Sequence, residues 1–316
     1  MCEFCLASSS IRACLPFDFR PWANWRQYLI TQRHYLLTEG DSPFCDMPGW
    51  SIFRNKMDML HLCFLGFARD ISACMLLILA GTFRPHLDLA DGLAWLHTEF
   101  RVWCKQRRTS CNIGRFSLKL IGLATAVEKV YPILASRIKG AKVKILMKWL
   151  ANMSTRARAL DDTPAAKNRQ LMMLGIVGFV HECDRAALFL TPDQKERAGK
   201  CARTFLLAYQ LESERSYDRP LFKMKPKVHY FGHMVDFMME TGENPASLDT
   251  WDYENFCGRI KRVCRNTHRT TASLRTAQRY LVLMAIRWRR RDGKQCFVCP
   301  SPCWLHQAVL RRRLVS

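Results

Sequence analysis

The chain has 316 residues, of which 49% are hydrophobic and 24% are charged. This composition is that of a folded globular protein and excludes a predominantly disordered chain. The formal net charge of +22 favours a polyanionic partner, with DNA preferred and RNA as the alternative. The charge is uneven, because residues 251–316 hold 15 Lys plus Arg against 3 Asp plus Glu, a net charge of +12. This asymmetry predicts a basic C-terminal surface.

The 15 cysteines are too dispersed in a chain of this size to indicate a small disulfide-rich secreted domain. The residues after Met1 do not follow the order of a signal peptide, so reduced thiols in an intracellular compartment are expected. With DNA as the preferred partner, this compartment is expected to be the nucleus. Two apolar stretches, 71–83 and 171–180, are shorter than the ~20 residues that a membrane span requires. They are predicted to be buried helices, and no membrane partner is expected.

Residues 1–48 are expected to form an irregular N-terminal segment with one helix over 22–37. The run "GWSIF" at 49–53 is aromatic and β-branched, which favours a strand. Apolar residues then recur every three or four positions over 57–81, a helical spacing. These residues are Leu60, Phe64, Phe67, Ile71, Met75 and Ile78. Asp58 would lie at the junction between strand and helix.

Residues 86–217 are almost wholly helical in pattern, with breaks predicted at 107–114, 131–132, 161–164 and 190–194. At the last break, Thr191 and Pro192 form a helix start, because proline is tolerated in the first turn. A proline-punctuated linker at 216–227 precedes a helix over 228–239 and a loop over 240–250. Two further helices are expected at 252–265 and 271–291, followed by a basic, cysteine-containing tail at 292–316.

Asp58 and His61 are three positions apart, which on a helix lets their side chains share a metal ion or form a hydrogen bond. The alternative is structural: Asp58 caps the helix and His61 is incidental.

His229 and His233 have the four-residue spacing that places two imidazoles on one helical face. They indicate either half of a metal site or a polar face, and the glutamate of a metalloprotease motif is absent at position 230. Cys2 and Cys5 are likewise half a site whose partner pair the sequence does not name.

A second candidate zinc site lies in the tail, where four soft ligands fall within eleven residues. They are Cys296, Cys299, Cys303 and His306. The chain has no Gly-rich phosphate loop, no Gly-x-Ser-x-Gly elbow and no His-Glu-x-x-His, so nucleotide hydrolases, serine esterases and zincins are not indicated.

The stretch "WDYENFCGRIKR" places acids at the start of a basic helix. Asp252 is expected to cap this helix, whereas Glu254 has space beside Gly258 to hold Mg²⁺ near phosphates. Basic residues of this helix and the next are expected to contact a nucleic-acid backbone. They are Arg259, Lys261, Arg262, Arg265, Arg269, Arg275 and Arg279. The alternative is a solvated basic face.

Taken in order, "MDMLHLCFLGFARD", "KPKVHYFGHM" and "WDYENFCGRIKR…TTASLRTAQRYL" resemble a transposase-derived family known from dinoflagellate algae. This family is similar to the catalytic cores of CACTA-type and related DDE cut-and-paste transposases. The resemblance spans roughly residues 49–290. It implies an RNase H-like sheet, an all-helical insertion, and a Mg²⁺-dependent site in which Asp58, His61 and Glu254 are catalytic. Only 57 residues precede Asp58, and Asp41 or Asp46 would have to serve as a further acid.

The predicted fold is therefore mainly α, a large helical region with a truncated RNase H-like α/β corner. Its parts are an N-terminal segment (1–48), a transposase-like core (49–291, with the helical insertion at 86–217) and a tail (292–316). The predicted function is that of a transposase-like DNA-binding protein from a mobile element, an impaired fragment of a strand-transfer enzyme. The alternatives are a noncatalytic nucleic-acid-binding protein and a helical interaction scaffold.

Overall fold

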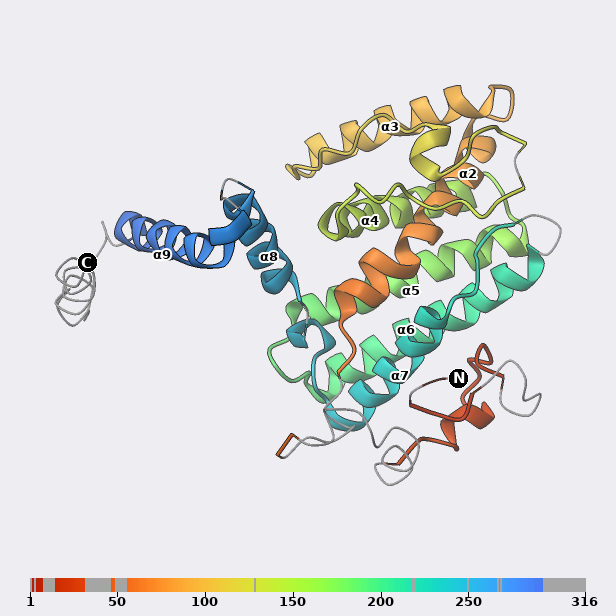
Figure 1. The fold of residues 1–316 in the computed structure, drawn as a ribbon. Coiled ribbons are helices and arrows are strands. Elements are labelled where there is room, and N and C mark those ends of the chain that lie inside the picture. The colour runs from red at the N-terminus through yellow and green to blue at the C-terminus, as the bar shows by residue number, and fades with distance from the viewer. Residues whose placement is uncertain are drawn as a thin grey trace, which may run out of the picture. The chain divides into compact units, whose positions relative to one another are not determined.

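The protein is mainly α-helical, as the sequence predicts (Figure 1). The structure, a computed structural model, describes residues 2, 4–7, 15–31, 47–48, 56–127, 129–216, 220–248, 250–265, 267 and 269–291. Within these ranges no β-sheet is formed, and extended pairing is confined to the isolated bridges Cys5–Leu29 and Phe189–Glu243. The expected RNase H-like corner is therefore not seen there, and its predicted strand at 49–53 lies outside the described residues.

The chain divides into two compact units, Met1–Thr250 (unit 1) and Trp251–Ser316 (unit 2). The division falls at Thr250, whereas the sequence suggested boundaries near residues 48 and 291. The N-terminal residues belong to unit 1 because several of them are buried in it, among them Phe19 and Trp25, which are 2% and 0% exposed.

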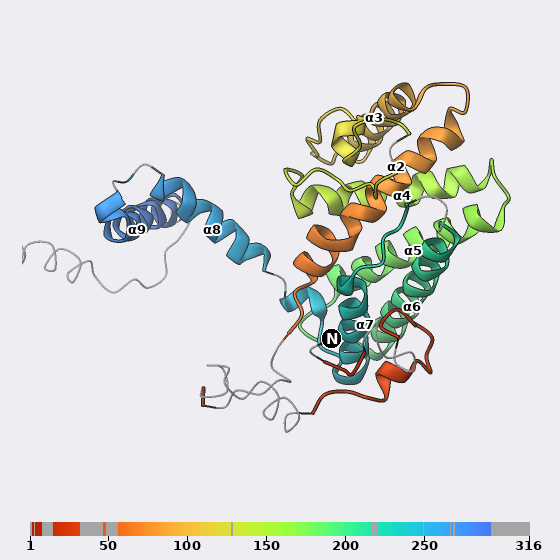
Figure 2. The ribbon, with the colours of Figure 1, turned by 45° about the vertical axis from the view of Figure 1, so that its right-hand side comes forward.

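Unit 1 is built from long helices packed against one another. In chain order they are η3 (Leu60–Phe67), α2 (Ala68–Phe83), α3 (Leu89–Gln106), α4 (Gly140–Arg158), α5 (Pro164–Arg185), α6 (Pro192–Arg215) and α7 (Pro226–Thr241). Short 3₁₀ turns lie at η1 (Asn24–Arg26), η4 (Leu118–Ile121) and η5 (Pro245–Leu248). Helix α5 packs against both α4 and α6, and α7 packs against α6 and η3 (Figures 1 and 2). The N-terminal segment lies beside α6 and α7 in both views.

The core of unit 1 runs along η3 and α2, where the sequence predicted a buried helix. The first eight residues of this run form a π-helix that is kinked at Gly66, where φ and ψ are −100° and −122°, and α2 follows it. Phe67, Ile71 and Met75 are at most 1% exposed, which confirms the predicted apolar stripe. By length and composition the run Leu60–Phe83 is apolar enough to cross a membrane, but 78% of its most apolar window is buried within the protein.

The predicted helix start at Thr191 is confirmed. The Thr191 hydroxyl accepts a hydrogen bond from the Gln194 N–H, and the Gln194 side chain accepts one from the Thr191 N–H, a capping box with Pro192 in the first turn. The break at 161–164 is confirmed too, because Thr163 caps α5 and Pro164 begins it. These termini set where α5 and α6 begin and hence which of their faces meet.

Two sequence-based elements are wrong. The predicted breaks at 107–114 and 131–132 are confirmed, but the described residues after each break, which were expected to be helical, are not helical up to residue 139 except at η4. Their apolar side chains, such as Phe116 and Leu134, are buried from an irregular path instead. Of the helix predicted over 22–37, residues 22–31 are described, and only η1 among them is helical. Residues 32–37 lie outside the described ranges. Here Leu29 pairs with Cys5 in a β-bridge, a conformation that a helix excludes.

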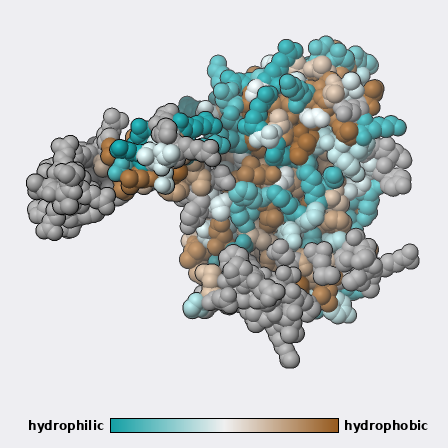
Figure 3. Space-filling view, in the orientation of Figure 1, coloured by the Kyte–Doolittle hydropathy of each residue, from teal (hydrophilic) through white to brown (hydrophobic). Residues whose placement is uncertain are grey.

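Unit 2 contains two helices and the turn between them: α8 (Trp251–Cys264), η6 (Arg269–Thr271) and α9 (Ala272–Arg291). These bounds agree closely with the predicted 252–265 and 271–291. The rings of Phe256 and Tyr280 meet edge to face at 5.2 Å between centroids and join the two helices. Hydrophobic and hydrophilic residues both lie on the surface of this unit (Figure 3). Leu274 and Leu281 are 55% and 64% exposed, because two helices alone bury little apolar surface.

Candidate metal centre

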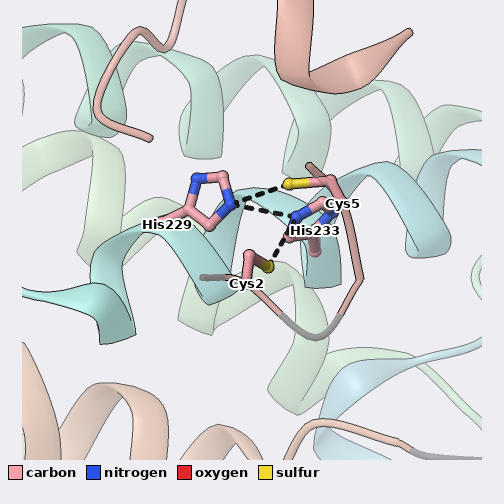
Figure 4. Close-up of side chains that lie close together, drawn as sticks. All are labelled: Cys2, Cys5, His229 and His233. Carbon is pink, nitrogen blue, oxygen red and sulfur yellow. Dashed lines mark hydrogen bonds between the residues drawn. The ribbon is translucent and has the colours of Figure 1, made fainter. Parts of the chain in front are cut away.

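Four potential metal ligands from the two ends of unit 1 meet in one buried cluster. Cys2 and Cys5 come from the N-terminal segment, and His229 and His233 come from α7. Their side chains point toward one another (Figure 4), and the four donor atoms all lie within 4.8 Å of each other. We call these four residues the Cys₂His₂ cluster.

The spacing of the donor atoms fits a tetrahedral metal ion. The Cys2 Sγ lies 3.5 Å from the His233 Nε2, the Cys5 Sγ lies 3.3 Å from the His229 Nε2, and the two Nε2 atoms are 3.1 Å apart. With Zn–S and Zn–N bonds of about 2.3 Å and 2.0–2.1 Å, tetrahedral angles place S and N about 3.6 Å apart and two N atoms about 3.3 Å apart. The cluster therefore has the dimensions of a closed Cys₂His₂ zinc site.

Local backbone structure explains how each pair is presented. The Phe4 N–H donates to the Cys2 Sγ and the Ala7 N–H donates to the Cys5 Sγ, both at 3.4 Å. These hydrogen bonds fold the C-x-x-C stretch so that both sulfur atoms face one side. On α7, residues four apart lie one turn above each other, which places His229 and His233 on the same face.

Hydrogen bonds favour the thiolate form within the cluster. The hydrogen bond with Cys5, then those with His229 and His233, lower the pKa of Cys2 well below that of an ordinary thiol, although burial opposes this. Cys111, which lies outside the cluster, behaves in the opposite way: burial raises its pKa to about 11. Thiolate is the form that binds metal, so Cys2 is prepared for coordination whereas Cys111 is not.

His229 presents its Nε2 atom to the other ligands. Its Nδ1 is buried and has no hydrogen-bond partner among the described residues. Coordination through Nε2 requires the tautomer that carries its proton on Nδ1. Among the described residues, this Nδ1 has no carboxylate or carbonyl of the kind that commonly supports a ligating histidine.

Trp25 covers the cluster on the side of the N-terminal segment. Its ring meets both histidine rings at 4.7 Å between centroids, and a Cβ atom at Gly232 of α7 would lie only 3.3 Å from it. The indole N–H donates to the Asp18 carbonyl at 2.6 Å. The Cys₂His₂ cluster is thereby shielded from water by an aromatic side chain that the sequence did not single out.

Asp58 and His61 lie close together, as their spacing predicts, and they share a hydrogen bond. The Asp58 carboxylate also accepts hydrogen bonds from the Leu60 N–H at 2.8 Å and the Thr250 hydroxyl at 2.5 Å. Burial alone would raise the pKa of Asp58, but the hydrogen bonds from Thr250 and His61 outweigh burial and lower it. These contacts are those of an acid that holds the start of η3 in place.

The proposed partner of Asp58 in a Mg²⁺ site is Glu254, whose side chain lies outside the described part of the structure. Asp58 belongs to unit 1 and Glu254 to unit 2. The catalytic assignment of Asp58, His61 and Glu254 with Mg²⁺ therefore stays a prediction. The side chain of Asp252 and the alternative acids Asp41 and Asp46 also fall outside the described residues.

Five of the seven predicted nucleic-acid contacts have described side chains, and all five are exposed, on α8, directly after it or on α9. They are Lys261, Arg262, Arg265, Arg275 and Arg279. The side chains of Arg259 and Arg269 lie outside the described residues, as does the whole predicted zinc site in the tail.

No protein-family model, no curated protein and no solved structure matches this chain significantly. The resemblance to DDE transposases, including DNA binding and nuclear location, therefore stays a prediction.

Proposed function

We propose that the protein binds one Zn²⁺ ion at Cys2, Cys5, His229 and His233, and that this ion fastens the N-terminal segment to α7. The observation that supports the proposal is the donor spacing of 3.1–3.5 Å among four buried ligands. Two thiolates and two imidazoles select Zn²⁺ rather than Mg²⁺, which prefers oxygen ligands. A closed set of four protein ligands leaves no position for a substrate, so the role is structural.

Zinc content tests this function directly. The full-length protein, purified with zinc and dialysed, is expected to contain one zinc ion per chain by elemental analysis, and Cys5→Ser is expected to contain much less. Cys111→Ser is the matched control, because Cys111 is buried but lies outside the cluster. Zinc content that is equal in Cys5→Ser and Cys111→Ser would contradict the proposal, as would zinc-free wild-type protein. The tail residues Cys296, Cys299, Cys303 and His306 are the other predicted zinc ligands. The zinc content of Cys299→Ser therefore measures how much of the bound zinc the tail holds.

A second function, nucleic-acid binding by unit 2, is supported by its five exposed cations, which are Lys261, Arg262, Arg265, Arg275 and Arg279. Phosphate contacts release counterions, so the logarithm of the affinity falls linearly with the logarithm of the salt concentration by about 0.9 per neutralised phosphate. For five contacts we expect a slope of roughly −4 to −5 on duplex DNA of arbitrary sequence.

Fluorescence anisotropy at several salt concentrations measures this slope. Arg265→Gln and Arg275→Gln are each expected to reduce its magnitude by about 1. Lys200→Gln is the control, because Lys200 is an exposed cation of α6 in unit 1. The idea fails if the full-length protein does not bind the duplex at low salt, or if Lys200→Gln changes the slope as much as the variants in unit 2.

A further inference from the structure

A cavity of about 480 Å³ borders the Cys₂His₂ cluster, with His233 in its wall. Phe4, Leu29 and Ile30 of the N-terminal segment form one side, and Met234 and Phe237 of α7 form another. The volume is in the range of small-molecule sites, which are mostly apolar with a few polar groups.

Most of the charges around this cavity are already paired. Arg26 forms an ion pair with Asp236, and the Lys56 Nζ lies 3.0 Å from a Glu243 carboxylate oxygen. The Lys56 ammonium also lies 3.4 Å from the centre of the Phe237 ring. An ionic ligand would have to compete with these partners, whereas an uncharged ligand gains apolar contact without separating them.

The two remaining charged residues in the wall are Arg203 and Glu240, one of each sign, and both are exposed to solvent. They therefore add no net charge to the interior of the cavity. Charge and volume together select an uncharged, mainly apolar molecule.

One side of the cavity depends on the metal ligands for its position. Phe4 lies between Cys2 and Cys5 in the chain, and the Ile30 N–H donates to the Phe4 carbonyl at 2.9 Å. Leu29 is joined to Cys5 by the β-bridge. A metal ion that fixes Cys2 and Cys5 therefore also fixes Phe4, Leu29 and Ile30.

We propose that this cavity binds an uncharged, mainly apolar small molecule and that Zn²⁺ in the Cys₂His₂ cluster is required for tight binding. This inference rests on the proposed zinc function. Ligand binding and zinc binding are then coupled, so each strengthens the other by the same factor.

Nile red, an uncharged apolar dye, is the probe, and its fluorescence is titrated with the zinc-loaded full-length protein. Saturable binding of one dye per chain at this site is expected. Leu29→Trp places a larger side chain at the mouth and should weaken that binding about tenfold, the equivalent of about 1.4 kcal/mol. Leu160→Trp is the matched control and should stay within about twofold of wild type. Leu29 and Leu160 are 57% and 67% exposed, so neither change is expected to prevent folding.

Two further measurements test the chemical class and the metal dependence. 1-Octanol should displace the dye, whereas octanoate, of equal chain length but charged, should displace it much less. Removal of zinc with a chelator should weaken dye binding about as much as Leu29→Trp. The proposal is overturned if Leu29→Trp or the zinc-free protein binds the dye as tightly as the zinc-loaded wild type. It is also overturned if octanoate displaces the dye as well as 1-octanol does.

Zinc content measured on the same samples separates the two ideas. One zinc ion per chain with dye binding insensitive to Leu29→Trp overturns the cavity proposal and leaves the zinc function in place. If the purified protein contains no zinc, the proposed zinc function is wrong, and so is the proposed coupling between zinc binding and ligand binding.

Discussion

At the scale of single residues, Asp58 is an acid whose charge the fold stabilises. Its pKa is lowered in the folded state, where Thr250 and His61 donate hydrogen bonds that outweigh burial. An unfolded-state Asp has a pKa of about 3.9. The charged form therefore contributes stability above about pH 4, and the contribution is lost as the pH falls through the lower, folded-state pKa.

Asp58→Asn keeps the shape of the side chain and removes the charge. We expect it to lower the free energy of unfolding by about 1–2 kcal/mol at pH 7, because hydrogen bonds to a charged group are lost. Urea unfolding at pH 7 and at pH 3 measures the change, which should shrink at the lower pH. Asp162→Asn is the control, because that side chain is 90% exposed. Equal stability of Asp58→Asn and wild type at pH 7 would refute the role of the charge.

The same scale shows what sequence reasoning found and missed at the metal centre. The spacings of Cys2 with Cys5 and of His229 with His233 marked both halves, because each spacing is local. The sequence did not predict that the cysteine pair and the histidine pair form one site. Cys5 and His229 are 224 positions apart, and no spacing rule spans such a distance. The signal available was that each pair lacked two ligands of the kind that the other pair provides.

At the scale of elements, α5 and α6 approach closely at Gly175. A Cβ atom there would lie 2.8 Å from both the Cys201 carbonyl oxygen and the Phe205 nitrogen, which are backbone atoms of α6 and cannot rotate away. Gly175→Ala is therefore expected to force the helices apart and to destabilise the protein by about 1–3 kcal/mol.

Gly81 in α2 provides the control, since a Cβ atom there would meet no atom of the described residues within 4 Å. Gly81→Ala should stabilise the protein by about 0.5–1 kcal/mol, because alanine loses less backbone entropy in a helix. Thermal and urea unfolding of both variants measure the difference. A destabilising effect of Gly81→Ala as large as that of Gly175→Ala would show that close contact with the backbone of α6 is not the cause of the loss at Gly175.

Elements were predictable where local chemistry decides them. The capping residues Thr163 and Thr191 and the apolar spacing of η3 and α2 act within one or two helical turns, and those predictions were confirmed. The helices expected between residue 114 and α4 were wrong, because the apolar side chains described there are buried along an irregular path, which tertiary contacts and not periodicity determine. The helix predicted around Trp25 was wrong for the same reason, since the conformation there depends on packing against α7.

At the scale of the whole molecule, the Cys₂His₂ cluster closes a loop of more than 200 residues between the N-terminal segment and α7. A metal that binds only the folded protein stabilises it according to its concentration relative to the dissociation constant. Other contacts also hold the segment, among them the ion pair between Arg26 and Asp236 and the packing of Trp25. Zinc removal is therefore expected to weaken unit 1 without unfolding it at room temperature.

Free zinc at 100 times the dissociation constant should contribute about 2.7 kcal/mol. For a unit of about 250 residues, this corresponds to an increase in Tm of about 5–10 °C over the zinc-free protein. Differential scanning calorimetry across a zinc series measures the shift, and Cys111→Ser should reproduce it. Cys5→Ser should have a Tm that does not respond to zinc, because an incomplete ligand set binds too weakly to favour the folded state. A zinc-dependent Tm of equal size in Cys5→Ser would place the stabilising ion elsewhere in the chain and would contradict the role of the cluster in joining the N-terminal segment to α7.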